Sequence, residues 1–95
     1  MSTEVSWEPV YVLVSGDGTA HEEMLSLLGE EYGGTAEREG EWWKVTIRPI
    51  DQFRRGTIIY RVVQASRTLA DRHPEATTYL VTEDGNRWRL PPPPL

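Results

Sequence analysis

The feature that most constrains the fold is one long helical pattern over Asp51–His73. Apolar residues recur there at intervals of three and four, which places them on one side of a helix. A stripe of that width has to be buried against another layer, so the helix is expected to depend on tertiary packing. Asp51 is the predicted N-cap, and Pro74 cannot continue the helix. The stripe consists of Ile58, Ile59, Val62, Val63, Ala65, Ser66, Leu69 and Ala70.

Length and composition limit the possible domain organisation and class of the protein. With 95 residues, the chain is expected to form a single α+β domain over residues 1–90 and a proline-rich tail over residues 91–95. The absence of cysteine excludes disulfides and thiolate metal sites. No apolar run approaches the length of about 20 residues that spans a membrane, and the first residues do not resemble a secretory signal. A cytoplasmic location is therefore the expectation. Nine arginines against one lysine are typical of a high-GC bacterial or phage genome.

The net charge of −5 is distributed unevenly. Residues 1–43 hold ten acidic residues and one arginine, whereas residues 44–95 hold five acidic and nine basic residues. Such asymmetry can indicate an anionic partner for the basic half. The simpler interpretation is that the two halves neutralise each other within one fold, because their charges fall mainly on two different helices.

Five strands and one further helix are predicted around the long helix. The run Val10–Ser15 is apolar and β-branched, as in a central strand. A helix is expected over Thr19–Tyr32, where Thr19 and Glu22 have the capping-box spacing. The polar stretch Thr35–Glu39 suits only an edge strand. Clean alternation predicts a strand over Glu41–Arg48, and the last two strands are expected over Thr77–Thr82 and Asn86–Leu90.

The last two strands are expected to form a hairpin with a two-residue turn at Asp84-Gly85. That turn pairs Val81 with Trp88, and it places Leu80 opposite Arg89. Leu80 and Thr82 would then point to the same side of the sheet as the two arginines of the last strand.

The order of elements predicts an α+β sandwich of the ferredoxin-like type, βαββαβ with an extra C-terminal strand. Right-handed crossovers place both helices on one face of a mainly antiparallel sheet. The predicted order across the sheet is fourth, first, third and second strand, with the fifth strand outside the fourth. One sheet face is then left uncovered by the domain's own helices.

The uncovered face is the main candidate site. If Trp43, Val45 and Ile47 point at the helices, the alternating residues of the same strand point away. Leu13, Thr46 and Thr82 are expected on that outer face as well. The residues predicted to form a partner-binding surface are Tyr11, Trp42, Lys44, Arg48, Leu80, Arg87 and Arg89.

Three functions are compatible with this surface. A small non-enzymatic interaction module, such as a regulator, adaptor or inhibitor, would use its aromatic and arginine-rich face to bind another protein or a second copy. Single-stranded nucleic acid could also stack on the aromatics and pair with the cations, but the acidic net charge and the missing RNP1 pattern oppose this. A small dimeric-barrel enzyme would need a pocket lined by Trp43, Tyr79 and Trp88.

The remaining motifs do not predict catalysis. The stretch Ser15–Thr19 joins a strand to a helix but lacks the lysine and the third glycine of phosphate-binding loops. Neither His21 nor His73 belongs to a metal-ligand spacing, so no catalytic, metal or cofactor residue is assigned. The arginines of the long helix and the tail Pro91–Pro94 are expected to be a solvated face and a bland extension, respectively, rather than ligand sites. Those arginines are Arg54, Arg55, Arg61 and Arg67.

Overall fold

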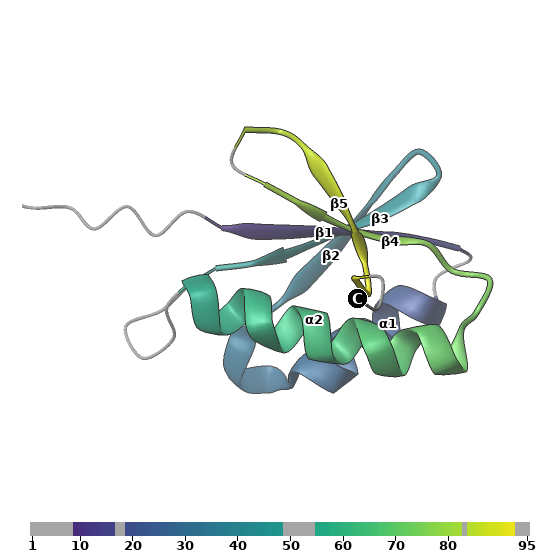
Figure 1. Cartoon of the computed structure of the whole chain (residues 1–95), viewed down its shortest axis with the longest axis horizontal. Coiled ribbons are helices and arrows are strands. Elements are labelled where there is room, and N and C mark those ends of the chain that lie inside the picture. Colours follow the sequence, from purple (N-terminus) through teal and green to yellow (C-terminus); the bar gives the residue numbers. More distant parts are fainter. Residues whose placement is uncertain (1–8, 17–18, 49–54, 83, 93–95) are drawn as a thin grey trace, which may run out of the picture.

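A computed structural model of the chain describes residues 9–16, 19–48, 55–82 and 84–92. It has two layers, a five-stranded sheet and a pair of α-helices that lie together on one side of it (Figure 1). The elements in chain order are β1 (Val10–Ser15), α1 (Thr19–Leu28), a short 3-10 helix (Glu30–Tyr32), β2 (Thr35–Glu39), β3 (Trp42–Ile47), α2 (Arg55–Arg72), β4 (Thr78–Val81) and β5 (Arg87–Leu90).

The strands lie in the order β2-β3-β1-β4-β5, and every neighbouring pair is antiparallel. β1 is therefore the central strand, with two strands on either side of it. Its β-branched sequence suits this position, because a central strand has neighbours along both of its edges. The predicted α+β class, with two helices and an antiparallel sheet, is confirmed.

The first helix is shorter than the sequence pattern predicted. α1 ends at Leu28, and the next residue, Gly29, has φ of 93°. This positive φ is easy for glycine and ends the α-helix, after which Glu30–Tyr32 form a separate 3-10 turn. The long helix α2 is described from Arg55, so the predicted N-cap at Asp51 and the first predicted turn lie outside the described residues.

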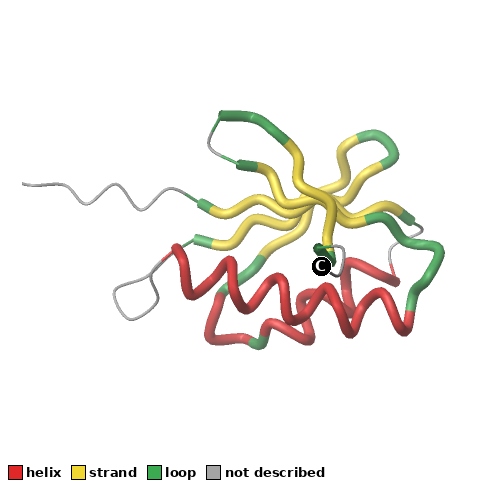
Figure 2. Tube along the Cα trace, in the orientation of Figure 1, coloured by secondary structure: helices red, strands yellow, loops and turns green. Residues whose placement is uncertain are grey.

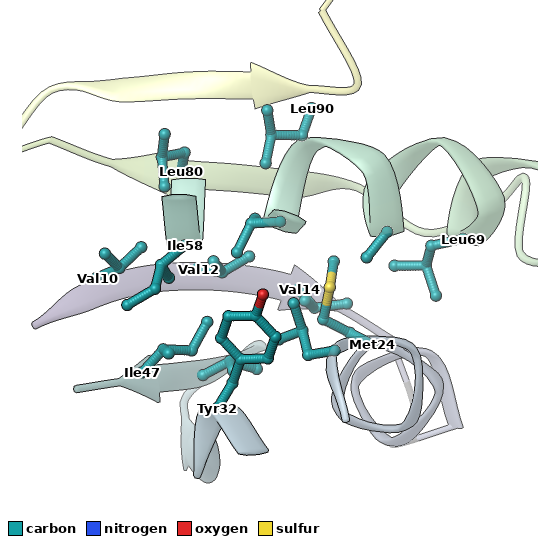
Figure 3. Packing of buried hydrophobic residues seen from close by; sticks show 14 of the residues in the cluster. Val10, Val12, Val14, Met24, Tyr32, Ile47, Ile58, Leu69, Leu80 and Leu90 are labelled. Carbon is teal, nitrogen blue, oxygen red and sulfur yellow. The ribbon is translucent and has the colours of Figure 1, made fainter. Parts of the chain in front are cut away.

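The core lies between the sheet and the two helices (Figure 3). Val10, Val12 and Val14 of β1 point into it and have no exposed surface. Met24 comes from α1, and Ile58 and Leu69 come from the predicted apolar stripe of α2. Burial of such side chains stabilises a fold by roughly 1.5–3 kcal/mol each relative to exposure. This packing supplies the stabilisation that α2 needs, because its own helix propensity is low.

The two helices pack together and pair part of the opposing charge of the two halves. Arg72 in the last turn of α2 forms an ion pair with Glu23 of α1. Arg61 donates a hydrogen bond of 3.3 Å to the carbonyl oxygen of Leu27. Arg72 also suits the negative end of the α2 dipole. The expectation that the acidic and basic helices lie side by side is confirmed by these contacts.

The β4–β5 hairpin has a different register from the predicted one. The backbone N–H of Thr82 donates to the carbonyl of Asn86, so three residues rather than two separate the paired positions. Gly85 at the third of them has φ of 84°, as in a three-residue hairpin loop. The Thr82 hydroxyl donates to the Asp84 carboxylate, which lowers the pKa of Asp84. The observed partners are Val81 with Arg87 and Leu80 with Trp88.

Candidate functional site

The candidate site is the sheet face that lies opposite the helices, here called the open face. In Figure 2 both described α-helices lie on one side of the sheet and leave this face uncovered. Because residues paired across neighbouring strands point to the same side, the register assigns its members. They are Thr35, Glu37 and Glu39 of β2, Trp42, Lys44 and Thr46 of β3, Tyr11, Leu13 and Ser15 of β1, Tyr79 and Val81 of β4, and Arg87 and Arg89 of β5.

Aromatic rings occupy the middle of the open face. Trp42 meets Tyr79 edge to face, with ring centroids 5.6 Å apart and planes at 67°. Tyr11 lies on the strand between them in the sheet. Leu13 is only 7% exposed although it points away from the helices. Its neighbours across the strands are Lys44 and Tyr79, whose long side chains can cover it. The centre of the open face is therefore apolar at its base and aromatic above.

Cations lie over these rings. The Lys44 ammonium is 4.3 Å from the centroid of the Tyr11 ring, and the Arg87 guanidinium is 5.9 Å from that of Trp42. Both distances are within the range of cation–π attraction. Lys44 also lies 3.7 Å from a carboxylate oxygen of Glu39.

The charges on the open face divide by strand. The edge strand β2 contributes the carboxylates of Glu37 and Glu39, and the opposite edge strand β5 contributes the guanidinium groups of Arg87 and Arg89. The aromatic centre separates the two. The face as a whole is therefore dipolar in the direction across the strands.

Most of the predicted site residues do share this face. Tyr11, Trp42, Lys44, Arg87 and Arg89 belong to it. Arg48 is exposed directly after the end of β3, beyond the paired residues.

The predicted position of Leu80 is wrong. Leu80 is 9% exposed and belongs to the core on the helix side of the sheet. The additional loop residue shifts the pairing by one, and a shift of one exchanges the two faces of a strand. Thr82, also predicted on the outer face, follows the end of β4 and pairs with Asn86 through its backbone N–H. Tyr79 and Val81 take their places on the open face, and only knowledge of the loop length could have identified them.

The open face is hollowed along β1 and β4. A depression of about 590 Å³ is lined by residues that include Tyr11, Leu13, Lys44, Val81 and Arg87. The two charged side chains and the tyrosine border an apolar base, which suits insertion of a side chain from a partner.

The helix side of the sheet holds a second aromatic contact. His21 in the first turn of α1 stacks on Trp43 of β3, with ring centroids 3.8 Å apart. Burial lowers the pKa of His21; Glu22 opposes this effect, and Arg38 adds to it. Arg38 also lies 5.4 Å from the Trp43 ring centroid. This stacking contact packs the first turn of α1 against β3.

The pocket predicted for an enzyme does not form. Tyr79 lies on the open face, whereas Trp43 and Trp88 are on the helix side, so the three rings cannot line one cavity. Trp88 is 63% exposed, at the rim of a hollow beside Ile59 and Leu80.

The other sequence motifs gain no ligand geometry. Over the described residues, no group of three or more histidine and acidic side chains is arranged to hold a metal ion. His73 lies 3.8 Å from Glu75 at the end of α2. The loop Ser15–Thr19, Arg54 and the end of the proline tail fall wholly or partly outside the described residues. No helix within the described ranges is long and apolar enough to cross a membrane.

No family model, curated protein or solved structure proved significantly similar to the chain.

Proposed function

We propose that the chain is a small protein-interaction module and that the open face is its contact surface. The observation that carries this proposal is the Trp42–Tyr79 pair, which joins β3 and β4 across the central strand on a sheet face over which no described helix lies. Aromatic and arginine side chains contribute most of the binding free energy at protein interfaces, especially near the centre and above an apolar base. Tyr11, Leu13 and Arg87 supply the rest of that composition.

The proposed scaffold is a ferredoxin-like sandwich extended by one strand. The sheet order read from the β5 edge, with β4, β1, β3 and β2 following, supports this assignment. The antiparallel pairing of β1 with both β3 and β4 also supports it. In such a scaffold the two helices cover one sheet face and leave the other accessible to a partner. Because this topology hosts many functions, it does not by itself choose a partner.

Single-stranded nucleic acid is the second candidate, because three cations accompany the aromatic rings on the open face. Two observations favour protein over nucleic acid. The faces of the Tyr11 and Trp42 rings already have cations over them, whereas base stacking requires a free ring face. Glu37 and Glu39 also lie on this face and would repel phosphate.

The test is affinity capture of the tagged chain from a lysate of its natural host, with and without nuclease treatment. The wild type is compared with Trp42→Ala, which removes one ring of the aromatic pair, and with Arg87→Glu at an exposed position. Gln64→Ala on the exposed surface of α2 is the matched control. Circular dichroism establishes that each variant is folded.

We expect a protein that is captured by the wild type and the control but lost from both open-face variants. Capture that is unchanged in both variants would refute the proposed surface. Captured material that disappears after nuclease treatment would instead favour nucleic acid. In that case the nucleic-acid alternative predicts that an oligonucleotide quenches the tryptophan fluorescence of the chain at low salt.

A further inference from the structure

We infer that the partner of the open face is a second copy of this chain, bound face to face about a two-fold axis that runs parallel to β1. This inference rests on the proposed function, since it uses the same surface and names its occupant. The basis is a row of side chains across the sheet whose two ends carry opposite charges. When a second copy of the row faces the first in the reversed direction, opposite charges meet.

One row of paired residues crosses all five strands. Glu37 on β2 pairs with Lys44 on β3, Lys44 with Leu13 on β1, Leu13 with Tyr79 on β4, and Tyr79 with Arg89 on β5. All five side chains point to the open face, because each is directly opposite its neighbour. The row has Leu13 at its centre, a carboxylate at one end and a guanidinium at the other.

A two-fold axis along β1 reverses this row in the second copy. Glu37 of one copy then faces Arg89 of the other, and the same pair repeats at the opposite edge. Lys44 faces Tyr79, which is a cation–π combination, and Leu13 faces Leu13. Each position of the row therefore meets a residue of complementary chemistry.

The two neighbouring rows are compatible with the same axis. One contains Thr35, Thr46, Tyr11, Val81 and Arg87, so its reversal places Tyr11 against Tyr11 and Arg87 against the neutral Thr35. The other contains Glu39 of β2, Trp42 of β3 and Ser15 of β1, and it holds no second acidic residue that the reversal could bring against Glu39.

The charges also disfavour a face-to-face arrangement about the perpendicular axis. An axis across the strands, instead of along them, would place each strand over itself. Glu37 would then face Glu37, and Arg89 would face Arg89, which is unfavourable when the pairs are removed from water. The uneven distribution of charge thus favours the axis along the strands over the axis across them.

The size of the face indicates a reversible dimer. Five strands about 4.8 Å apart, and up to six residues of about 3.4 Å each, give a face of about 24 by 20 Å. Two such faces bury on the order of 1,000 Å², which is at the lower limit for specific interfaces. We therefore expect a dissociation constant in the micromolar range and an association that weakens as salt increases.

The test is sedimentation velocity of the full chain over micromolar to millimolar concentrations. Glu37→Arg and Arg89→Glu are each expected to raise the dissociation constant at least about tenfold, because each brings like charges together. The variant with both substitutions is expected to recover, since arginine and glutamate again face each other. An equimolar mixture of the two single variants is expected to form a heterodimer. Glu31→Arg and Arg67→Glu, exposed on the helical layer, make the same changes in net charge and serve as controls.

A wild-type chain that stays monomeric at millimolar concentration overturns the inference. So does a dimer that both single substitutions leave intact, or a double variant that associates no better than the single ones. These results are distinguishable from failure of the proposed function. A monomeric chain that still captures a protein dependent on Trp42 would retain the interaction surface and lose only the second copy as its occupant.

Discussion

Trp43 and His21 stack with their ring centroids 3.8 Å apart and their planes inclined by 14°, which joins the third strand to the first turn of α1. His21 is 6% exposed. Its Nδ1 and the Nε1 of Trp43 have no hydrogen-bond partner among the described residues. Burial lowers the pKa of this imidazole, and Arg38 adds to the effect, whereas the carboxylate of Glu22 opposes it.

Stability is expected to decrease as the pH falls below 6.5, the ordinary pKa of histidine. Burial lowers the pKa of His21 in the folded chain, so between the two pKa values the unfolded chain binds more protons. The free energy of unfolding therefore rises with pH through this window. The stabilising contribution of neutral His21 is fully present above pH 6.5. Urea unfolding at a series of pH values gives the slope of the free energy of unfolding against pH. This slope should be shallower for His21→Phe, which keeps a ring over Trp43, than for the wild type. His73→Gln is the control, and an equal slope in His21→Phe and the wild type would contradict the assignment.

Truncation of Leu69 in the helix–sheet core is expected to lower the free energy of unfolding strongly. This side chain is 1% exposed and lies in the apolar stripe of α2. Leu69→Ala is expected to lower the free energy of unfolding by about 2–5 kcal/mol, because it removes buried methyl groups and leaves a cavity. Arg67→Ala, two residues earlier on the exposed surface, should change it by less than about 0.5 kcal/mol. Urea denaturation measures both, and similar values for the two would contradict the burial of this stripe.

Two glycines should respond in opposite directions to alanine. Gly33 follows the 3-10 helix with φ of 60°, so Gly33→Ala is expected to destabilise the chain by about 1–2 kcal/mol. Gly56 lies in α2, and no atom is within 4 Å of a Cβ added there. Gly56→Ala should stabilise by about 0.5–1 kcal/mol, since alanine reduces the entropy of the unfolded chain. Thermal unfolding of both variants gives the signs, and a loss of stability in Gly56→Ala would show that the helix does not continue through this position.

The edge-to-face contact between Trp42 and Tyr79 should appear as a coupling in a double-mutant cycle. With Trp42→Leu and Tyr79→Leu, singly and combined, we expect a coupling of about 0.5–1.5 kcal/mol in the free energy of unfolding. Trp42→Leu combined with Tyr60→Leu on the exposed side of α2 should show none. Absence of coupling in the first cycle would place the two rings apart in solution.

Local sequence determined the kind and the approximate position of the elements. Alternation along Trp42–Ile47 placed Trp43, Val45 and Ile47 on the helix side, and the structure has them there. The spacing of apolar residues in α2 likewise identified Ile58, Val62, Ala65 and Leu69 as buried. These predictions succeed because the period of side chains along a helix or a strand is fixed by backbone geometry.

The tertiary structure alone decided which residues share the open face. Asp84-Gly85 suggested a two-residue turn, but the Thr82–Asn86 hydrogen bond closes a three-residue loop. That one residue moved Leu80 into the core and brought Tyr79 against Trp42, because a strand has only two faces and a shift of one exchanges them. The row from Glu37 to Arg89 likewise exists only through pairing between strands distant in the sequence. The sequence by itself determined the elements and their apolar sides, whereas the register between strands, which depends on loop geometry and long-range hydrogen bonds, determined the surface.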